Sequence, residues 1–275
     1  MIKDVMVRLD GSSGDDARLA AAMQIAANFD SHVTGLFFNV LPPTPIPDEV
    51  SGANPSNQLL DAAKEAGDKI ESELFRRLTR LPQPANLRRF DVAGTSDIAD
   101  AALPVARTGD TFVALRPNGR ANEPQDLIEN LLYGAGRHLF LVPDDWTGLA
   151  PLDNVVVAWN GSRESARAVA ESLPFLRQAK KVGVLTVEGE HQTADALKGN
   201  DAVLHLRHHG IDAVKYRAIG EEDDPADVLI AECRSLGANL LVMGSYGHSR
   251  LHELLPGSTT SRILRSAPLP LLIAH

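Results

Sequence analysis

Short apolar runs and longer amphipathic stretches alternate along the whole chain. Apolar runs of about four to eight residues are typical of strands buried in a parallel sheet, whereas an apolar residue at every third or fourth position indicates a helix. This pattern predicts strands over residues 33–39, 87–92, 111–115, 139–142, 181–187, 213–219, 240–243 and 271–274. It predicts helices over residues 15–29, 59–81 and 165–176 and shorter ones between the other strands. Strands that alternate with helices form α/β folds, so we expect parallel sheets with helices on both faces.

The pattern occurs twice. Residues 2–13 read IKDVMVRLDGSS and residues 152–163 read LDNVVVAWNGSR, so each copy has a charged lead-in, an apolar strand and then Asp-Gly-Ser or Asn-Gly-Ser. An alanine-rich helix follows in both copies, and the later elements come in the same order. Self-similarity of this kind indicates a repeated structural unit. We therefore predict two domains, 1–144 and 152–275, with the seam near 144–153.

Glycines and hydroxyl residues are regularly spaced near the end of the chain. The predicted strand 240–243 leads into Gly244 and Gly247, and Gly257 and Ser258 follow after nine further residues, at the start of a helical pattern. Glycine lets backbone N–H groups approach a bulky anion, and a helix N-terminus presents unpaired donors and a partial positive charge. The spacing therefore predicts a nucleotide-phosphate site. The alternative is that the glycines serve turns and that Ser258 caps the helix.

This G-x2-G-x9-G-S stretch resembles the ATP-binding signature of the universal stress protein family. The opening VMGSYGHSRL and the closing APLPLLIAH are also similar to that family, and the repeat resembles its tandem type, with two universal stress protein domains in one chain. The resemblance implies two Rossmann-like, doubly wound, parallel five-stranded sheets with strand order 3-2-1-4-5. In such a sheet a ligand lies beyond the carboxyl ends of the strands, where the order reverses, here between strands 1 and 4.

The resemblance also implies which residues of the second copy hold the nucleotide. The adenosine pocket would be lined by Ala158, Asn160, Val187 and Met243, and the ribose and phosphates would be held by Gly244, Gly247, Gly257, Ser258 and Thr259. ATP-binding members typically carry Asp where this chain has Asn160. Asn keeps a carbonyl acceptor but lacks the charge that helps to hold a divalent ion. We expect ATP, with or without Mg²⁺, and the substitution weakens the case for hydrolysis more than the case for binding.

The first copy lacks the glycine motif. Its strand 111–115 runs into Arg-Pro-Asn-Gly-Arg, and Gly134 and Gly136 are expected late in the next helix. We therefore predict that domain 1–144 keeps the scaffold with a degenerate phosphate loop, and that only domain 152–275 holds nucleotide. In the second copy Trp159 is expected to pack in the sheet rather than to stack on adenine, because alternate residues of a strand point to opposite faces.

Composition narrows the possible partners. The net charge is −9 and the basic residues are scattered, so we expect no nucleic-acid partner. The chain shows no signal peptide and no apolar run of membrane-spanning length, so we expect no membrane association. Its one cysteine, Cys233, lies in a helical pattern and is interpreted as a packing residue. A single cysteine also favours a cytoplasmic location.

Two histidine pairs have the four-residue spacing that can bind a metal on a helix: His205 with His209, and His248 with His252. No carboxylate or cysteine partner is visible near either pair, so we expect no metal site. His205 and His209 are interpreted as the polar end of a surface helix. No catalytic motif appears, so we expect no catalytic residues.

Three functions fit this sequence. The first is a non-catalytic ATP-binding protein of stress response or signalling, whose nucleotide sets its conformation or its still unknown protein partners. The second is a nucleotide-free scaffold that acts by protein–protein interaction. The third is a slow ATPase, for which the sequence places no general base.

The last predicted strand of each domain, 139–142 or 271–274, would be a sheet edge in the order 3-2-1-4-5. An apolar edge favours pairing with another strand. This edge resembles the dimer contact of universal stress proteins, in which the final strands of two domains run antiparallel. We predict that the two edges pair within one chain as a pseudo-dimer, and that any homodimer uses another surface, such as the helix at 59–81.

Overall fold

The computed structural model describes residues 1–43, 55–117, 123–188, 199–220, 224–245 and 259–275. Its strands are β1 (Asp4–Leu9), β2 (His32–Val40), β3 (Ala85–Val92), β4 (Thr111–Leu115), β5 (Leu139–Val142), β6 (Asn154–Ala158), β7 (Lys181–Glu188), β8 (Ala213–Ile219), β9 (Leu240–Gly244) and β10 (Leu271–Ala274). Its helices are α1 (Gly14–Phe29), α2 (Pro55–Leu78), α3 (Asp97–Ala106), α4 (Gln125–Gly134), α5 (Arg163–Gln178), α6 (Asn200–His208), α7 (Pro225–Ser235) and α8 (Thr259–Ser266).

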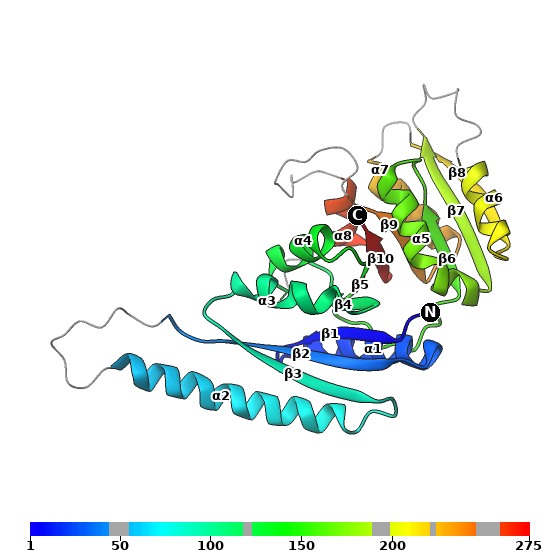
Figure 1. The fold of residues 1–275 in the computed structure, drawn as a ribbon. Coiled ribbons are helices and arrows are strands. Elements are labelled where there is room, and N and C mark those ends of the chain that lie inside the picture. The colour runs from blue at the N-terminus through cyan, green and yellow to red at the C-terminus, as the bar shows by residue number, and fades with distance from the viewer. Residues whose placement is uncertain (44–54, 118–122, 189–198, 221–223, 246–258) are drawn as a thin grey trace.

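The strands form one sheet in the order β3-β2-β1-β4-β5-β10-β9-β6-β7-β8. We call β1–β5 with α1–α4 the N-terminal half, and β6–β10 with α5–α8 the C-terminal half (Figure 1). Pairing is parallel within each half, and each half has the predicted order 3-2-1-4-5. The predicted α/β class and strand order are therefore confirmed.

The two halves join through their last strands. β5 and β10 are antiparallel, with Leu271 opposite Leu141, Leu272 opposite Phe140 and Ile273 opposite Leu139. Exchanging the halves maps the outer two pairs onto each other, so Phe140 and Leu272 lie on a local two-fold axis. The predicted pairing of the two edges within one chain is confirmed. It removes both apolar edges from solvent, because β5 and β10 are buried along their whole length.

Each face of the sheet carries its own core. Side chains alternate between the two faces along each strand, and residues such as Val5 and Val7 lie on the face covered by α1, α2, α5 and α6. Residues such as Met6 and Met243 lie on the face covered by α3, α4, α7 and α8. Both cores draw residues from both halves, so the seam between the halves is packed like a domain interior.

Most observed element boundaries lie within one or two residues of the predicted ones, and two larger differences have a physical reason. α2 spans Pro55–Leu78 rather than 59–81, because the backbone after Leu78 tightens into turns in which Arg80 N bonds Arg77 O and Leu81 N bonds Leu78 O. The prediction that Gly136 lies in a helix is wrong: α4 ends at Gly134, and Gly136 has a φ of 65°, which suits glycine outside a helix. No helix among the described residues has the length and apolar character needed to span a membrane.

Candidate functional site

The carboxyl ends of β6 and β9 lie side by side in the C-terminal half. Val157 pairs with Val242, so Ala158 and Met243, one residue further along each strand, are neighbours. Met243 is buried, and Ala158 and Val187 are partly buried against the same core, beneath α7 and α8. The structure thus brings these three predicted residues to one face of the sheet. Trp159 packs against the opposite core, so the prediction that it belongs to the sheet packing is confirmed.

Asn160 follows β6 and is exposed. Its side-chain Oδ1 accepts a hydrogen bond from Ser162 N at 3.0 Å, and Gly161 between them has a φ of 78°. Ser162 then caps α5, because its Oγ accepts from Ser165 N at 3.1 Å. A turn closed by a side-chain carbonyl therefore leads from the strand into the helix, and it needs an acceptor at Asn160 but no charge.

The same turn occurs in the N-terminal half. Asp10 Oδ1 accepts from Ser12 N at 3.0 Å, and Gly11 has a φ of 79°. The repeated Gly-Ser sequence therefore produces one local geometry twice. The two halves differ instead in what surrounds the turn.

Gly244, at the end of β9, lies against the first turn of α5. A Cβ at this position would be 2.5 Å from both Glu164 C and Ser165 N. Such a contact is too short for any other residue, so packing alone requires glycine here. In the N-terminal half the large and small partners are exchanged: Leu115 ends β4, and its Cδ1 lies 2.8 Å from where a Cβ of Gly14 would be.

The remaining predicted residues divide between described and undescribed parts of the chain. Thr259 is the first residue of α8 and is exposed. Gly247, Gly257 and Ser258 lie outside the described residues, as do His248 and His252. The role of the loop that contains them therefore stays a prediction.

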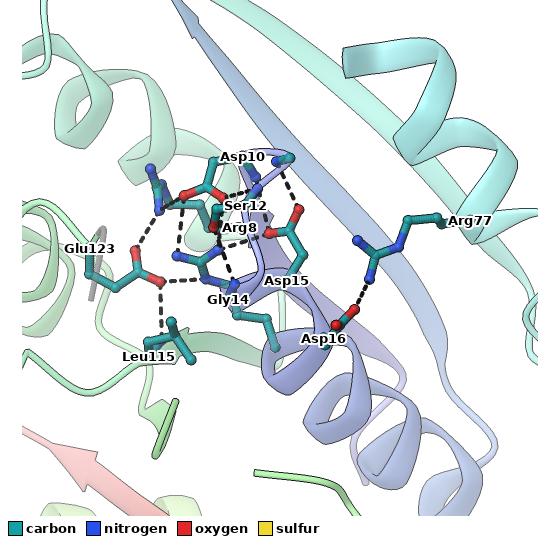
Figure 2. Close-up of polar contacts among 11 residues, drawn as sticks. Arg8, Asp10, Ser12, Gly14, Asp15, Asp16, Arg77, Leu115 and Glu123 are labelled. Carbon is teal, nitrogen blue, oxygen red and sulfur yellow. Dashed lines mark hydrogen bonds and ion pairs between the residues drawn. The ribbon is translucent and has the colours of Figure 1, made fainter. Parts of the chain in front are cut away.

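Buried and partly buried charged residues cluster at the carboxyl ends of β1 and β4 in the N-terminal half (Figure 2). We call Arg8, Asp10, Asp15, Arg18 and Glu123 the ion cluster. Glu123 accepts from Arg18 Nε at 2.7 Å, from Arg8 Nη1 at 3.0 Å and from Leu115 N at 3.0 Å. The cluster therefore ties the end of β1 to the end of β4, which is where the fold leaves room for a ligand.

Arg18 is the centre of the ion cluster. Its side chain is 0% exposed and lies 2.8 Å from Asp15 Oδ1 and 3.1 Å from Asp10 Oδ1. Burial alone would raise the pKa of Asp10, but the charges of Arg18 and Arg8 outweigh it and lower the pKa to about 2. Burial raises the pKa of Asp15, the charge of Asp10 raises it further, and Arg18 only partly opposes them.

At three positions of the ion cluster the described part of the C-terminal half has small neutral residues instead. Equivalent positions follow from the repeat and from matching strand registers: Val5–Val33 with Val155–Val182, and Val7–Val113 with Val157–Val242. On this alignment Arg8 corresponds to Ala158, Asp15 to Ser165, Arg18 to Ala168 and Phe38 to Val187. Phe38 is buried and stacks on Phe90 with a centroid distance of 5.3 Å. At these four positions the N-terminal half therefore has larger side chains than the C-terminal half.

Sequence reasoning missed the ion cluster, although two signals point to it. Arg8 interrupts the apolar run of β1, and Asp15 and Arg18 are three residues apart in α1, so they face the same way. The third carboxylate, Glu123, comes from a distant segment, and only the tertiary fold brings it to the arginines.

Cys233 and the pair His205 and His209 take no part in the contacts described for this site. Cys233 is buried in α7, and burial raises the pKa of its thiol to about 12, which confirms its role in packing. The rings of His205 and His209 contact edge to face at 4.6 Å near the C-terminal end of α6. Among the described residues, no three His, Cys, Asp or Glu side chains are arranged to hold a metal ion.

Comparison with known proteins gives one family match. Residues 151–275 match the model of the Universal stress protein family. The C-terminal part of the chain is a Usp domain. The search of curated proteins gave no match.

Solved structures match the fold of the whole chain, not only the Usp domain. A universal stress protein from Archaeoglobus fulgidus DSM 4304 is 16% identical, with a TM-score of 0.71, and the match covers 98% of this chain and 97% of that one. A functionally unknown protein from Pseudomonas aeruginosa PAO1 is also 16% identical, with a TM-score of 0.60 and coverage of 99% and 92%. A putative universal stress protein from P. aeruginosa UCBPP-PA14 is 16% identical, with a TM-score of 0.60, and the match covers 99% of this chain and 93% of that one. At this identity the likeness concerns the fold, and it extends over both halves.

Proposed function

We propose that this chain is a non-catalytic ATP-binding protein of stress response or signalling, with the nucleotide held by the Usp domain. The observation that carries the proposal is the difference between the halves. The same side-chain-closed turn follows the first strand of each half, but among the described residues the ion cluster is found in the N-terminal half only. The C-terminal half has Ala158, Ser165 and Ala168 there instead, and its sequence continues with the glycine motif.

Each part of the proposed site matches a part of the nucleotide. The apolar side chains of Ala158, Val187 and Met243 face the same way and suit an adenine ring. Asn160 offers amide groups beside them for ribose or base, and the start of α8 at Thr259 offers backbone N–H groups to phosphate. Gly247, Gly257 and Ser258 complete the proposed phosphate contacts. An amide in place of a carboxylate at Asn160 gives a bound divalent ion one charge less, which favours binding without hydrolysis.

A nucleotide-free scaffold is the second candidate function. It is favoured by Gly244, whose glycine is explained by its close contact with Glu164 and Ser165 and does not require a ligand. The two functions differ in one simple observation. The ATP-binding protein should release adenine nucleotide when the purified protein is denatured, and mass spectrometry should find it as ATP rather than ADP. A scaffold would release none, and an ATPase would release ADP.

Titration calorimetry of glycine variants tests the loop. Gly247→Val and Gly257→Val each place a branched Cβ where backbone is proposed to approach phosphate, so both should lose ATP affinity and stay folded. Gly94→Val is the matched control, because a Cβ there meets only Ser96 Oγ at 3.5 Å and Asp97 Oδ2 at 3.9 Å. Wild-type affinity in both loop variants would remove the loop from the site.

A second variant pair tests the place of the adenine ring. Ala158→Arg brings into the C-terminal half the side chain that Arg8 supplies in the N-terminal half, and it should abolish ATP binding. Ala158→Ser at the same position adds one small hydroxyl and should bind ATP nearly as the wild type does. Equal affinities in the two variants would place the nucleotide elsewhere.

A further inference from the structure

Arg116 crosses the seam between the halves. It follows β4 directly, and its backbone N donates to Val142 O at 2.9 Å. Its side chain is buried, with 7% of the residue exposed, and Nη1 donates at 3.0 Å to Leu264 O. Leu264 belongs to the last turn of α8, the helix whose first residue is Thr259. A residue of the N-terminal half thus holds one end of the helix whose other end is the proposed phosphate site.

The contact is favourable at this end of the helix. The last carbonyl groups of a helix lack partners within it and carry partial negative charge, so a buried guanidinium both satisfies and stabilises them. Within its own half α8 is anchored by the apolar residues Ile263 and Leu264 and by Arg262, which pairs with Asp227 of α7 and with Asp224, the N-cap of that helix. Arg116 adds the anchor from the other half.

The residue of the C-terminal half that is equivalent to Arg116 makes a different contact. Ser245 takes the place of Arg116 after β9, because its N donates to Ala274 O as Arg116 N donates to Val142 O. The Ser245 hydroxyl donates to the same Ala274 O at 3.2 Å, within its own half. Of these two equivalent residues, only the arginine reaches the helix of the opposite half.

The helix α4, which occupies the place of α8 in the N-terminal half, is held differently. Arg107, at the C-terminal end of α3, donates through Nε to Gly134 O of α4 at 3.0 Å. Leu236 is the C-cap residue of α7, as Arg107 is of α3, and its side chain has no group that could donate a hydrogen bond to α8. An arginine of its own half therefore holds the last residue of α4, and Arg167 of α5 donates from across the seam to Gly136 O at 2.6 Å, two residues beyond that helix. In α8 it is the last turn itself that receives an arginine from across the seam.

We propose that Arg116 is a positioning residue for the nucleotide site of the Usp domain. By fixing the last turn of α8 it sets where the first turn lies, and so it couples the N-terminal half to ATP binding in the other half. The proposal rests on the proposed function for its effect on ATP, but not for its effect on α8. It also gives the N-terminal half a role although its own ligand position is filled.

The experiment compares Arg116→Met, Arg116→Lys and the matched control Arg107→Met in the full chain. Loss of a hydrogen bond from a charged donor should weaken ATP binding about tenfold in Arg116→Met. Arg116→Lys keeps the charge with a single point donor and should recover part of the affinity. Arg107→Met removes an arginine–carbonyl bond from the equivalent helix α4 and should bind ATP as the wild type does. If Arg116→Met does not fold, Arg116→Lys is compared with Arg107→Lys and should bind more weakly.

Hydrogen exchange without nucleotide separates this proposal from the proposed function. The amides of α8 should exchange faster in Arg116→Met than in the wild type, and at the wild-type rate in Arg107→Met. Unchanged α8 exchange in Arg116→Met would overturn the proposal, as would wild-type ATP affinity in that variant or equal losses in both arginine variants. Failure of the proposed function would look different, because the wild type itself would then show no affinity for ATP.

Discussion

Replacing Arg18 by methionine tests the ion cluster most severely. The guanidinium is fully buried and bonds three carboxylates, those of Glu123, Asp15 and Asp10. When Arg18 is removed, Arg8 is the one cation of the ion cluster that is left to balance the three carboxylates. Breaking a buried pair in this way costs about 3–5 kcal/mol, because a charge stays buried without its partner. Total stabilities are about 5–15 kcal/mol, so the loss should be large in urea unfolding at pH 7.

Arg77→Met is the matched control for this variant. Arg77 also pairs with an aspartate of α1, Asp16 (Figure 2). The side chain of that partner, however, is 81% exposed. Exposed pairs contribute about 0–1 kcal/mol, so the control should unfold nearly as the wild type does. Glu123→Gln leaves two arginines with two aspartates and should cost less than Arg18→Met.

The free energy of unfolding should depend on pH in opposite ways in the wild type and in Arg18→Met. In the wild type the pKa of Asp10 is lowered from 3.8 to about 2, so its stabilisation is present above pH 3.8 and is lost as the pH falls through 2. In Arg18→Met the crowded carboxylates should have raised pKa values, and proton uptake should relieve their repulsion. The deficit of the variant should therefore shrink as the pH falls from about 7 to about 5. A deficit no larger than that of Arg77→Met, or one that grows as the pH falls, would refute the reasoning.

Two further predictions concern the C-terminal half. The thiol of Cys233, with its pKa raised to about 12, should resist thiol reagents at pH 8 until the protein is unfolded; rapid labelling of the folded chain would contradict its burial. Gly244→Ala should lower the free energy of unfolding by about 1–3 kcal/mol, because its Cβ would meet the backbone of α5 at 2.5 Å. Gly94→Ala is the control, and equal unfolding midpoints for the two variants would argue against the close contact.

The fold was predictable because its signals are local and repeated. Apolar runs marked the strands to within one or two residues, as for β4, β5, β8 and β10, where predicted and observed bounds agree. The pairing of β5 with β10 followed from a general rule about apolar edges. The end of α2 was missed because residues 79–81 contain no glycine or proline that would mark the change from helix to turns.

The site was predictable only in part. The shared face of Ala158, Val187 and Met243 follows from strand alternation and a known strand order. The reason for Gly244 did not appear in the sequence, since its neighbour in space, Glu164, belongs to a helix 80 positions earlier in the chain. The ion cluster needed Glu123, and the hold of Arg116 on α8 needed the pairing of the two halves. Contacts of this kind depend on tertiary packing, which periodicity does not encode.

The number of ATP molecules bound per chain tests the central claim most directly. Equilibrium titration of the full chain should saturate near one, because the Usp domain has the glycine motif and small residues where the N-terminal half has the ion cluster. Ala158→Arg should then abolish binding altogether. A stoichiometry of two would show that the N-terminal half binds nucleotide despite the ion cluster, and a stoichiometry of zero would leave this chain a nucleotide-free scaffold.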